Sequence, residues 1–166
     1  MQNKMTINDK VKIMWLDDSK WYIIPRVDSL RRKGIETITA HNFRDGVSKL
    51  AENEQFDFYI VDGEFPERVH DERVEYMAGR FIDEIRQHHA NAIIIVYSGN
   101  PDLKSEVEKK GVKFIFKGSK PITTVLTELL DLRAYPQRLI ELSTIEDELN
   151  EVYPSRIGSK SEEISR

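Results

Sequence analysis

FDFYIVD, residues 56–62, is the stretch of sequence that decides the fold. It is an apolar run that ends abruptly in an acid, Asp62. Uninterrupted Val, Ile and aromatic residues are typical of a parallel strand that is buried on both faces. A carboxylate directly after such a strand lies at the rim of the sheet, because burying it in the core would cost several kcal/mol. Open α/β sheets carry their ligand sites at this rim.

Four other stretches are also typical of strands, and helical patterns separate them. The strands are expected over residues 11–16, 35–40, 92–97 and 112–116. Helices are expected from near Ile24 to 33, over 42–53, from 79 to 89, over 101–110 and from 122 onward. The first helix is expected to begin near Ile24 because Pro25 fits best in the first turn of a helix. This alternation predicts a doubly wound α/β fold, with a five-stranded parallel sheet and helices on both faces.

The remaining segments lie outside this alternation. Residues 63–77 are the least regular part of the chain, although the portion from Asp71 onward is also compatible with a helix. An extra amphipathic helix is expected over 135–153, from leucine and isoleucine at helical spacing. The polar, Ser-rich residues 154–166 are expected to be a disordered tail. The resulting division is a leader over 1–10, a domain over 11–134, the appended helix and the tail.

Composition restricts the class of protein. The chain has 166 residues, enough for one domain, and its 39% hydrophobic and 33% charged residues are ordinary for a globular protein. A net charge of −4 argues against a general binder of nucleic acid or of anionic membranes. The absence of cysteine excludes disulfides and thiolate metal sites. Because the sequence has neither a signal-peptide pattern nor a membrane-spanning apolar run, a cytoplasmic protein is expected.

Four of the predicted strands bring polar residues to one rim of the sheet. These residues are Asp17, Asp18, Asp62, Ser98 and Lys117. Three carboxylates close together repel one another unless they share a cation, and oxygen ligands alone select a hard ion such as Mg²⁺. A carboxylate is also a nucleophile toward a phosphoryl group, and forms an aspartyl phosphate. Simpler roles stay open: Asp18 and Ser98 as helix caps, and Lys117 as a lysine that extends to solvent.

In this pattern the chain resembles the receiver domain of two-component response regulators, over roughly residues 11–132. The matched residues are the acid pair Asp17-Asp18, Asp62 with Pro66 four residues on, Ser98-Gly99, Phe114 and Lys117. The resemblance implies a flavodoxin-like strand order of 2-1-3-4-5 and Asp62 as the phosphoacceptor. It also implies Mg²⁺ bound by Asp17, Asp18, Asp62 and the backbone carbonyl of Glu64. Ser98 and Lys117 would bind the phosphoryl oxygens, and Ser98 and Phe114 would act as the switch.

The chain departs from the family pattern at three places. Receiver domains usually carry proline directly after the lysine, whereas Gly118 follows Lys117 here and a Lys-Pro pair occurs only at Lys120. Strand length favours Lys117 as the functional lysine, with Lys120 as the alternative. The segment between Pro66 and Gly79 is longer than usual and is a candidate lid or partner surface. Gly63 is unusual after the acceptor.

Three functions follow from these residues. The first is a single-domain receiver that takes phosphate from a histidine kinase or phosphotransfer protein and signals through altered contacts with a downstream protein. The second is a receiver-like interaction module that works without phosphorylation. The third, a phosphatase of the haloacid-dehalogenase kind, is disfavoured because it needs Asp-x-Asp after the first strand, and Asp17 is followed by Asp18 and Ser19. Neither direct nucleic-acid nor membrane binding is expected, and the resemblance alone suggests a homodimer.

The chain has four histidines, none of which is expected at the functional site. His88 and His89 lie at the predicted end of a helix, where a positive charge interacts favourably with the helix dipole. No acid or second histidine pair completes a metal site around them. They are therefore interpreted as favourable partners of the helix dipole or as plain surface residues, and His41 and His70 are interpreted in the same way.

Overall fold

The computed structural model describes residues 11–32, 34–122 and 124–126, and within these residues its centre is a five-stranded parallel sheet. The strand order is β2-β1-β3-β6-β7. The strands are β1 (Lys12–Leu16), β2 (Glu36–Ala40), β3 (Phe58–Val61), β6 (Ile94–Ser98) and β7 (Lys113–Phe116). This confirms the predicted class and the predicted order 2-1-3-4-5, since β6 and β7 are the fourth and fifth parallel strands. β6 begins and ends slightly later than expected and includes Ser98.

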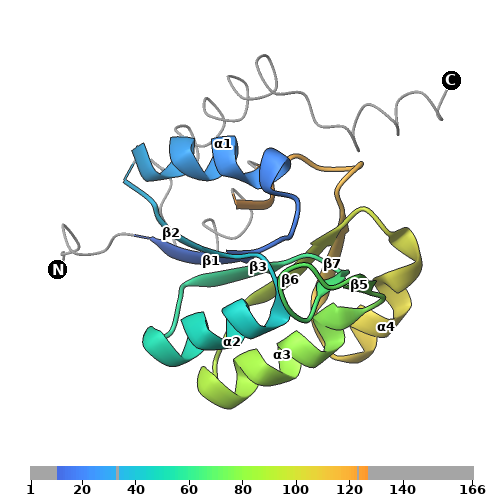
Figure 1. Ribbon diagram of the computed structural model, residues 1–166. Coiled ribbons are helices and arrows are strands. Elements are labelled where there is room, and N and C mark those ends of the chain that lie inside the picture. Colours follow the sequence, from blue (N-terminus) through green and yellow to red (C-terminus); the bar gives the residue numbers. More distant parts are fainter. Residues whose placement is uncertain (1–10, 33, 123, 127–166) are drawn as a thin grey trace, which may run out of the picture.

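Helices cover both faces of the sheet (Figure 1). α1 (Lys20–Arg32) packs on one face. α2 (Phe43–Glu52), α3 (Met77–His88) and α4 (Lys104–Lys109) pack on the other, and the short 3-10 turn η1 (Pro101–Leu103) leads into α4. A hydrophobic core lies on each face of the sheet, and side chains that alternate along β1 contribute to both. Ile13 and Trp15 face α1, while Met14 and Leu16 face α2 and α3.

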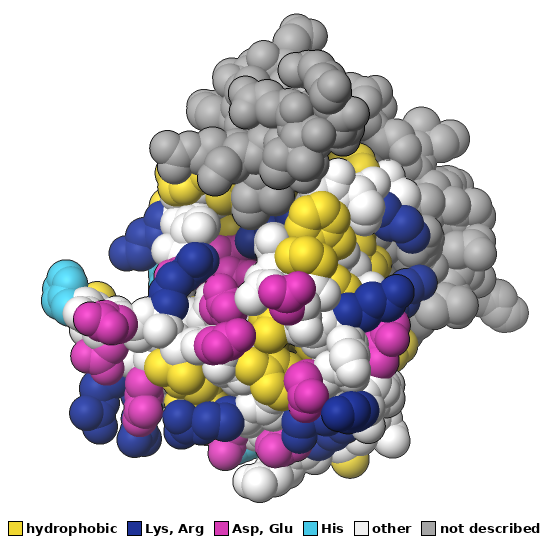
Figure 2. Space-filling model, turned by 90° about the vertical axis from the view of Figure 1, so that its right-hand side faces the viewer, with side chains coloured by type: hydrophobic (Ala, Val, Ile, Leu, Met, Phe, Trp, Pro, Cys, Tyr) yellow, Lys and Arg dark blue, Asp and Glu magenta, His cyan; other side chains and the backbone are white. Residues whose placement is uncertain are grey.

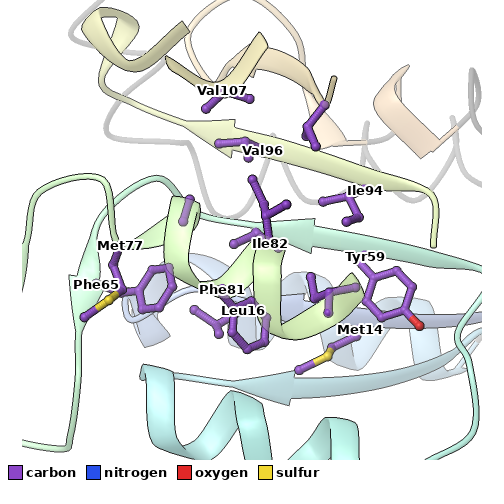
Figure 3. Packing of buried hydrophobic residues seen from close by; sticks show 14 of the residues in the cluster. Met14, Leu16, Tyr59, Phe65, Met77, Phe81, Ile82, Ile94, Val96 and Val107 are labelled. Atoms are coloured by element: carbon purple, nitrogen blue, oxygen red, sulfur yellow. The ribbon is translucent and has the colours of Figure 1, made fainter. Parts of the chain in front are cut away.

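The core between the sheet and α3 fixes the position of β3. Figure 3 shows Phe81 and Ile82 of α3 packed over Leu16 and Tyr59 of the sheet. Gly46 of α2 lies against the same layer, since a Cβ at this position would come within 2.6 Å of the Phe81 ring. Glycine here therefore permits the close approach of α2 to α3, a packing role that outweighs its poor helix propensity.

The start of α1 differs from the prediction. The helix begins at Lys20, not near Ile24, and Pro25 lies inside it. The backbone carbonyl of Ser19 accepts from the N–H groups of Tyr22 and Ile23, at 3.0 and 3.1 Å. These bonds of the first turn precede Pro25 and are not affected by it. Because proline has no N–H, it removes one helical hydrogen bond, the one that residue 25 would donate.

Residues 63–77 contain a small β-hairpin, which the sequence did not indicate. β4 (Phe65–Pro66) pairs antiparallel with β5 (Arg73–Val74), and α3 begins only at Met77, so a helix from Asp71 is wrong. Phe65 anchors the hairpin in the core, edge-on to the Phe81 ring. Strands of two residues carry no detectable periodicity, which explains why the pattern missed them.

His89 is another correction, because it is buried and not a surface residue. Its Nδ1 contacts the Tyr59 hydroxyl and its Nε2 contacts the Asn53 carbonyl oxygen at 3.0 Å. Nε2 must donate to the carbonyl, so in the neutral imidazole Nδ1 accepts from Tyr59. His88, one residue earlier, is exposed as expected. The apolar neighbours of His89 lie far from it in sequence, and the helix-end position gave no sign of them.

The last described residues, Ile122 and 124–126, include buried side chains of the core beside α1. The predicted leader over 1–10, the domain boundary at 134, the appended helix over 135–153 and the tail over 154–166 lie outside the described residues. Among the helices that the structure describes, none combines the length and the apolar character needed to cross a bilayer.

Candidate functional site

The sheet itself fixes the backbone of the predicted site residues. Asp17, Asp62 and Lys117 each extend the hydrogen bonding of a parallel strand by one residue beyond its end. Asp17 N–H donates to the Ala40 carbonyl at 3.0 Å, and Asp62 N–H donates to that of Leu16 at 2.9 Å. Lys117 N–H donates to the Ser98 carbonyl at 2.9 Å. The parallel register therefore brings residues from distant parts of the sequence to one rim, as the sequence predicted.

Three carboxylates and one ammonium group converge there. Asp17, Asp18 and Asp62 each offer an oxygen within 4.8 Å of the others. The Lys117 Nζ lies 2.6 Å from Asp17 Oδ2 and 3.9 Å from Asp62 Oδ1. Asp17 is fully buried, Asp62 is 4% exposed and Lys117 is 7% exposed. Buried charges of this kind are stable only as a mutually compensating group.

Burial and charge shift the protonation of these groups. Burial, followed by the charge of Asp17, raises the pKa of Asp62 to about 8, although Lys117 and Arg73 oppose the shift. Burial alone would lower the pKa of Lys117, but the neighbouring Asp17 and Asp62 outweigh it and raise that pKa. Below its own pKa the Asp62 carboxyl keeps its proton, and in the metal-free site Lys117 and Arg73 pair with Asp17 and Asp18. Ionisation of Asp62 adds a negative charge that these two cationic side chains do not offset.

Arg73 of the hairpin is a site residue that the sequence reasoning missed. Its Nε and Nη2 donate to the two oxygens of Asp18 at 3.0 and 2.9 Å. Nη2 also lies 3.6 Å from Asp62 Oδ2. The hydrogen bonds to Asp18 are the main cause of a raised pKa for Arg73. Arg73 is 55 residues from Asp18, and the only sequence signal was the unusual length of the segment that carries it.

A cavity of about 290 Å³ opens beside Asp62. Its lining includes Ser19, Glu64, Arg73, Ser98, Asn100 and Lys117. The Asn100 amide donates to Glu64 Oε2 at 2.9 Å, and Ser98 Oγ accepts from the Asn100 N–H at 3.1 Å. Figure 2 views the molecule from this rim and shows acidic and basic side chains interspersed over the face. The metal-binding role of the Glu64 carbonyl stays a prediction.

Gly63, noted as unusual after Asp62, is required by close packing. A Cβ at this position would come within 2.6 Å of Ser98 Oγ and 2.5 Å of Leu103 Cδ1. Its N–H donates to Asp62 Oδ1 at 2.7 Å. Glycine thus lets the loop after β3 lie directly against Ser98 and η1.

The two candidate lysines occupy different places. Lys117 Nζ is at the acid cluster and lies over the Tyr22 ring, 4.9 Å from its centroid. The Lys120 carbonyl instead accepts from the Tyr97 hydroxyl at 2.6 Å. Phe114 is buried on the α4 side of the sheet, in the cluster that includes Leu103. The structure therefore brings together Asp17, Asp18, Asp62, Ser98 and Lys117, with Phe114 in the core on the α4 side.

These residues fit a hard divalent cation such as Mg²⁺. The donor set consists of carboxylate oxygens without histidine or cysteine among the described residues of the cluster. Asp62 Oδ2 is buried and has no hydrogen-bond partner in the described part of the chain. A buried carboxylate oxygen without a donor is costly unless it receives a ligand.

Comparison with solved structures gives the fold class. The sequence matches no family model and no curated protein. The structure is similar to response regulator TrrA from Thermotoga maritima in complex with Mg²⁺-BeF, with a TM-score of 0.57 and 20% identity, covering 72% of this chain and 98% of that one. It is also similar to the chemotaxis response regulator CheY4 of Vibrio cholerae, with a TM-score of 0.57 and 22% identity, again covering 72% and 98%. A CheY-like receiver domain protein from Methanospirillum hungatei has a TM-score of 0.57 and 20% identity, covering 82% and 98%.

Proposed function

We propose that this chain, which has the fold of response regulator receiver domains, is a phosphoacceptor that is modified on Asp62. The observation that carries the proposal is the environment of this carboxylate. One of its oxygens is buried without a hydrogen-bond partner among the residues that the structure describes, and Asp17, Asp18 and Lys117 lie around the carboxylate. A nucleophile next to fixed cationic groups is what phosphoryl transfer requires.

The transfer step begins when the Asp62 carboxyl loses its proton to solvent. An oxygen of the resulting carboxylate attacks phosphorus, and a new O–P bond forms as the bond from phosphorus to the donor breaks. The leaving group, an imidazole nitrogen of a phosphohistidine or the carboxylate oxygen of acetyl phosphate, departs with the bonding electron pair. Lys117 Nζ, 3.9 Å from Asp62 Oδ1, stabilises the charge on the phosphoryl oxygens. Ser98 lines the same cavity and supplies a hydroxyl donor.

Asp17, Asp18 and Asp62 would hold Mg²⁺. When bound, the ion neutralises the carboxylates and the phosphoryl oxygens, so that two anionic groups can approach each other. The protein's own contribution is to hold the carboxylates within reach of one ion. The buried ion pair with Lys117 fixes the position of the Asp17 carboxylate in this cluster.

Phosphorylation would act on the face formed by α4 and β7. Gly63 packs directly against Ser98 and Leu103, so a new dianion on Asp62 bears on both. Movement of Ser98 toward the phosphoryl group would repack Phe114, which shares a core cluster with Leu103. The partners that fit this reaction are a histidine kinase or phosphotransfer protein as donor and a downstream protein that contacts the altered face. Homodimerisation through this face is a further prediction.

The test is the intact mass of the protein after incubation with acetyl phosphate and Mg²⁺. We expect a phosphate-sized increment that is absent in Asp62→Asn and absent without Mg²⁺. Lys117→Ala is expected to slow the modification far more than Lys120→Ala, which separates the two candidate lysines. A folded, Mg²⁺-binding wild-type protein that gains no mass would contradict the proposal.

One observation favours a second function, an interaction module that works without phosphorylation. Arg73 already occupies both oxygens of Asp18 and approaches Asp62, so the acid cluster is partly neutralised by the protein itself. In that case the β4–β5 hairpin would be the partner surface. The mass experiment distinguishes the two functions, because only the first gives an Asp62-dependent increment.

A further inference from the structure

The β4–β5 hairpin carries Arg73 to the acid cluster and is itself firmly attached. Phe65 is fully buried against α3, and the Arg44 N–H donates to the Glu67 carbonyl at 2.9 Å. The Glu67 carboxylate also pairs with Arg44 and Arg80, at 3.0 and 3.6 Å. These contacts fix the base of the hairpin to α2 and α3. The backbone of the hairpin therefore holds Arg73 beside the acid cluster.

The two oxygens of Asp62 have different surroundings. Oδ1 accepts from the Gly63 N–H at 2.7 Å and is the oxygen nearer to Lys117. Oδ2 has no hydrogen-bond partner among the described residues and faces Arg73 Nη2 at 3.6 Å. The hydrogen bond to Oδ1 stabilises the negative charge on that oxygen, which makes Oδ2 the better nucleophile. A phosphoryl group bonded to Oδ2 would place its oxygens beside the Arg73 guanidinium.

Arg73 and a divalent cation compete for Asp18. The guanidinium donates to both oxygens of Asp18 and carries a positive charge, so it weakens the binding of a metal ion by that carboxylate. A cation bound at Asp18 repels Arg73 in turn, and because the Arg73 side chain is 52% exposed it has room to leave Asp18. The nearest group for it is then the one bonded to Asp62.

The charges of the site indicate where Arg73 goes. A phosphoryl group on Asp62 gives that residue roughly two negative charges. Together with Asp17 and Asp18, these are balanced by a divalent cation, Lys117 and Arg73. Without Arg73 the loaded site keeps an excess negative charge in a largely buried position, which is unfavourable.

We propose that Arg73 is a phosphoryl-binding residue that exchanges partners: it holds Asp18 in the metal-free protein and binds the phosphoryl group on Asp62 once a divalent cation has taken Asp18. The inference rests on the proposed phosphorylation of Asp62. It assigns a function to the hairpin, which brings a third cationic group to the site.

The test is a set of three measurements on Arg73→Gln, in which the change expected for Mg²⁺ binding is opposite in sign to the other two. By calorimetry, Mg²⁺ should bind the variant about fivefold more tightly than wild type, because its competitor for Asp18 is gone. Beryllium fluoride, a phosphoryl analogue, should bind the Mg²⁺-loaded variant more weakly. Modification by acetyl phosphate should be about tenfold slower, since one donor to the phosphoryl oxygens is lost. A purely structural role would not improve one kind of binding and impair the other.

Arg80→Gln is the matched control. Arg80 is as exposed as Arg73 and pairs with Glu67 of the hairpin, but the contacts described for it do not include the acid cluster. Phe65 and the Arg44 N–H still hold the hairpin in this variant, and the lost pair is solvent-exposed, so both affinities and the modification rate should stay close to wild-type values. Arg73→Lys keeps the charge without the paired geometry and should restore part of the modification rate.

The outcomes separate the two proposals. The proposed function would be overturned if wild-type protein neither binds beryllium fluoride nor becomes phosphorylated on Asp62. Wild-type protein that is modified on Asp62, with Arg73→Gln unchanged in Mg²⁺ affinity and in modification rate, would overturn the role of Arg73 alone.

Discussion

Asp62 combines two properties that conflict in a structural residue: it is buried and it lies beside two other carboxylates. The cost is visible in its pKa, which burial and Asp17 raise to about 8. A side chain selected for stability alone would be an amide or an apolar group. The proposed phosphorylation would account for a carboxylate at this position.

The raised pKa of Asp62 makes the stability of the metal-free protein depend on pH. Because the folded protein binds this proton more tightly than the unfolded chain does, the stabilisation is fully present below the unfolded pKa of about 3.8. It is lost as the pH rises toward 8. Asp62→Asn keeps the shape without a titrating proton, so its free energy of unfolding should exceed that of wild type at pH 8 and approach it near pH 4.

Urea unfolding without Mg²⁺ at a series of pH values measures this difference. Adding Mg²⁺ at pH 8 should stabilise wild type and leave Asp62→Asn nearly unchanged, because the ion binds the native carboxylate cluster. A gap between the two proteins that stays constant from pH 4 to pH 8 would contradict the assigned pKa shift.

At the scale of elements, a buried polar group joins β3 to the ends of α2 and α3. The Tyr59 hydroxyl accepts from the Phe56 N–H at 2.9 Å and donates to His89, which in turn contacts the Asn53 carbonyl. Burial raises the pKa of Tyr59 to about 12, so the hydroxyl keeps its proton. This group fixes the start of the strand whose far end carries Asp62.

Tyr59→Phe should destabilise the fold by about 1–3 kcal/mol, because it leaves a buried N–H and a buried imidazole nitrogen without partners. Thermal or urea unfolding measures the loss. Tyr76→Phe is the matched control: its hydroxyl donates to the Glu106 carbonyl at 3.0 Å in an exposed position, where water replaces it. Equal losses in the two variants would show that the buried network adds nothing.

The sequence predicted the whole molecule better than it predicted its details. Apolar runs that end in Asp17, Asp62, Ser98 and Lys117 are enough to give the sheet, because parallel strands place their carboxyl ends together. The hairpin and the position of Arg73 could not be predicted from the sequence, because both depend on tertiary contacts that leave no local sequence pattern. The burial of His89 could not be predicted for the same reason, because its hydrogen-bond partners lie 30 and 36 residues away in the sequence.

The molecule also provides a route from the site to α4. The Asn100 amide joins Glu64, Gly63 presses on Leu103, and the Tyr76 hydroxyl donates to the Glu106 carbonyl. Each contact links the loop or hairpin after β3 to the segment after β6. A change at Asp62 should therefore reach α4 through packing and hydrogen bonds, and not through the distant edge strand β2.

Amide hydrogen exchange measures this route. With Mg²⁺ and beryllium fluoride, exchange should change over residues 63–76 and 99–110, because the contacts between these segments are remade around the new ligand. Residues 27–32 of α1 and residues 36–40 of the edge strand β2 should keep their rates, and Asp62→Asn should show neither change. A response confined to 63–76 would mean that the hairpin closes over the site without transmitting anything to α4. A change in α1 and β2 as large as that in α4 would instead indicate general stabilisation by the bound ligand.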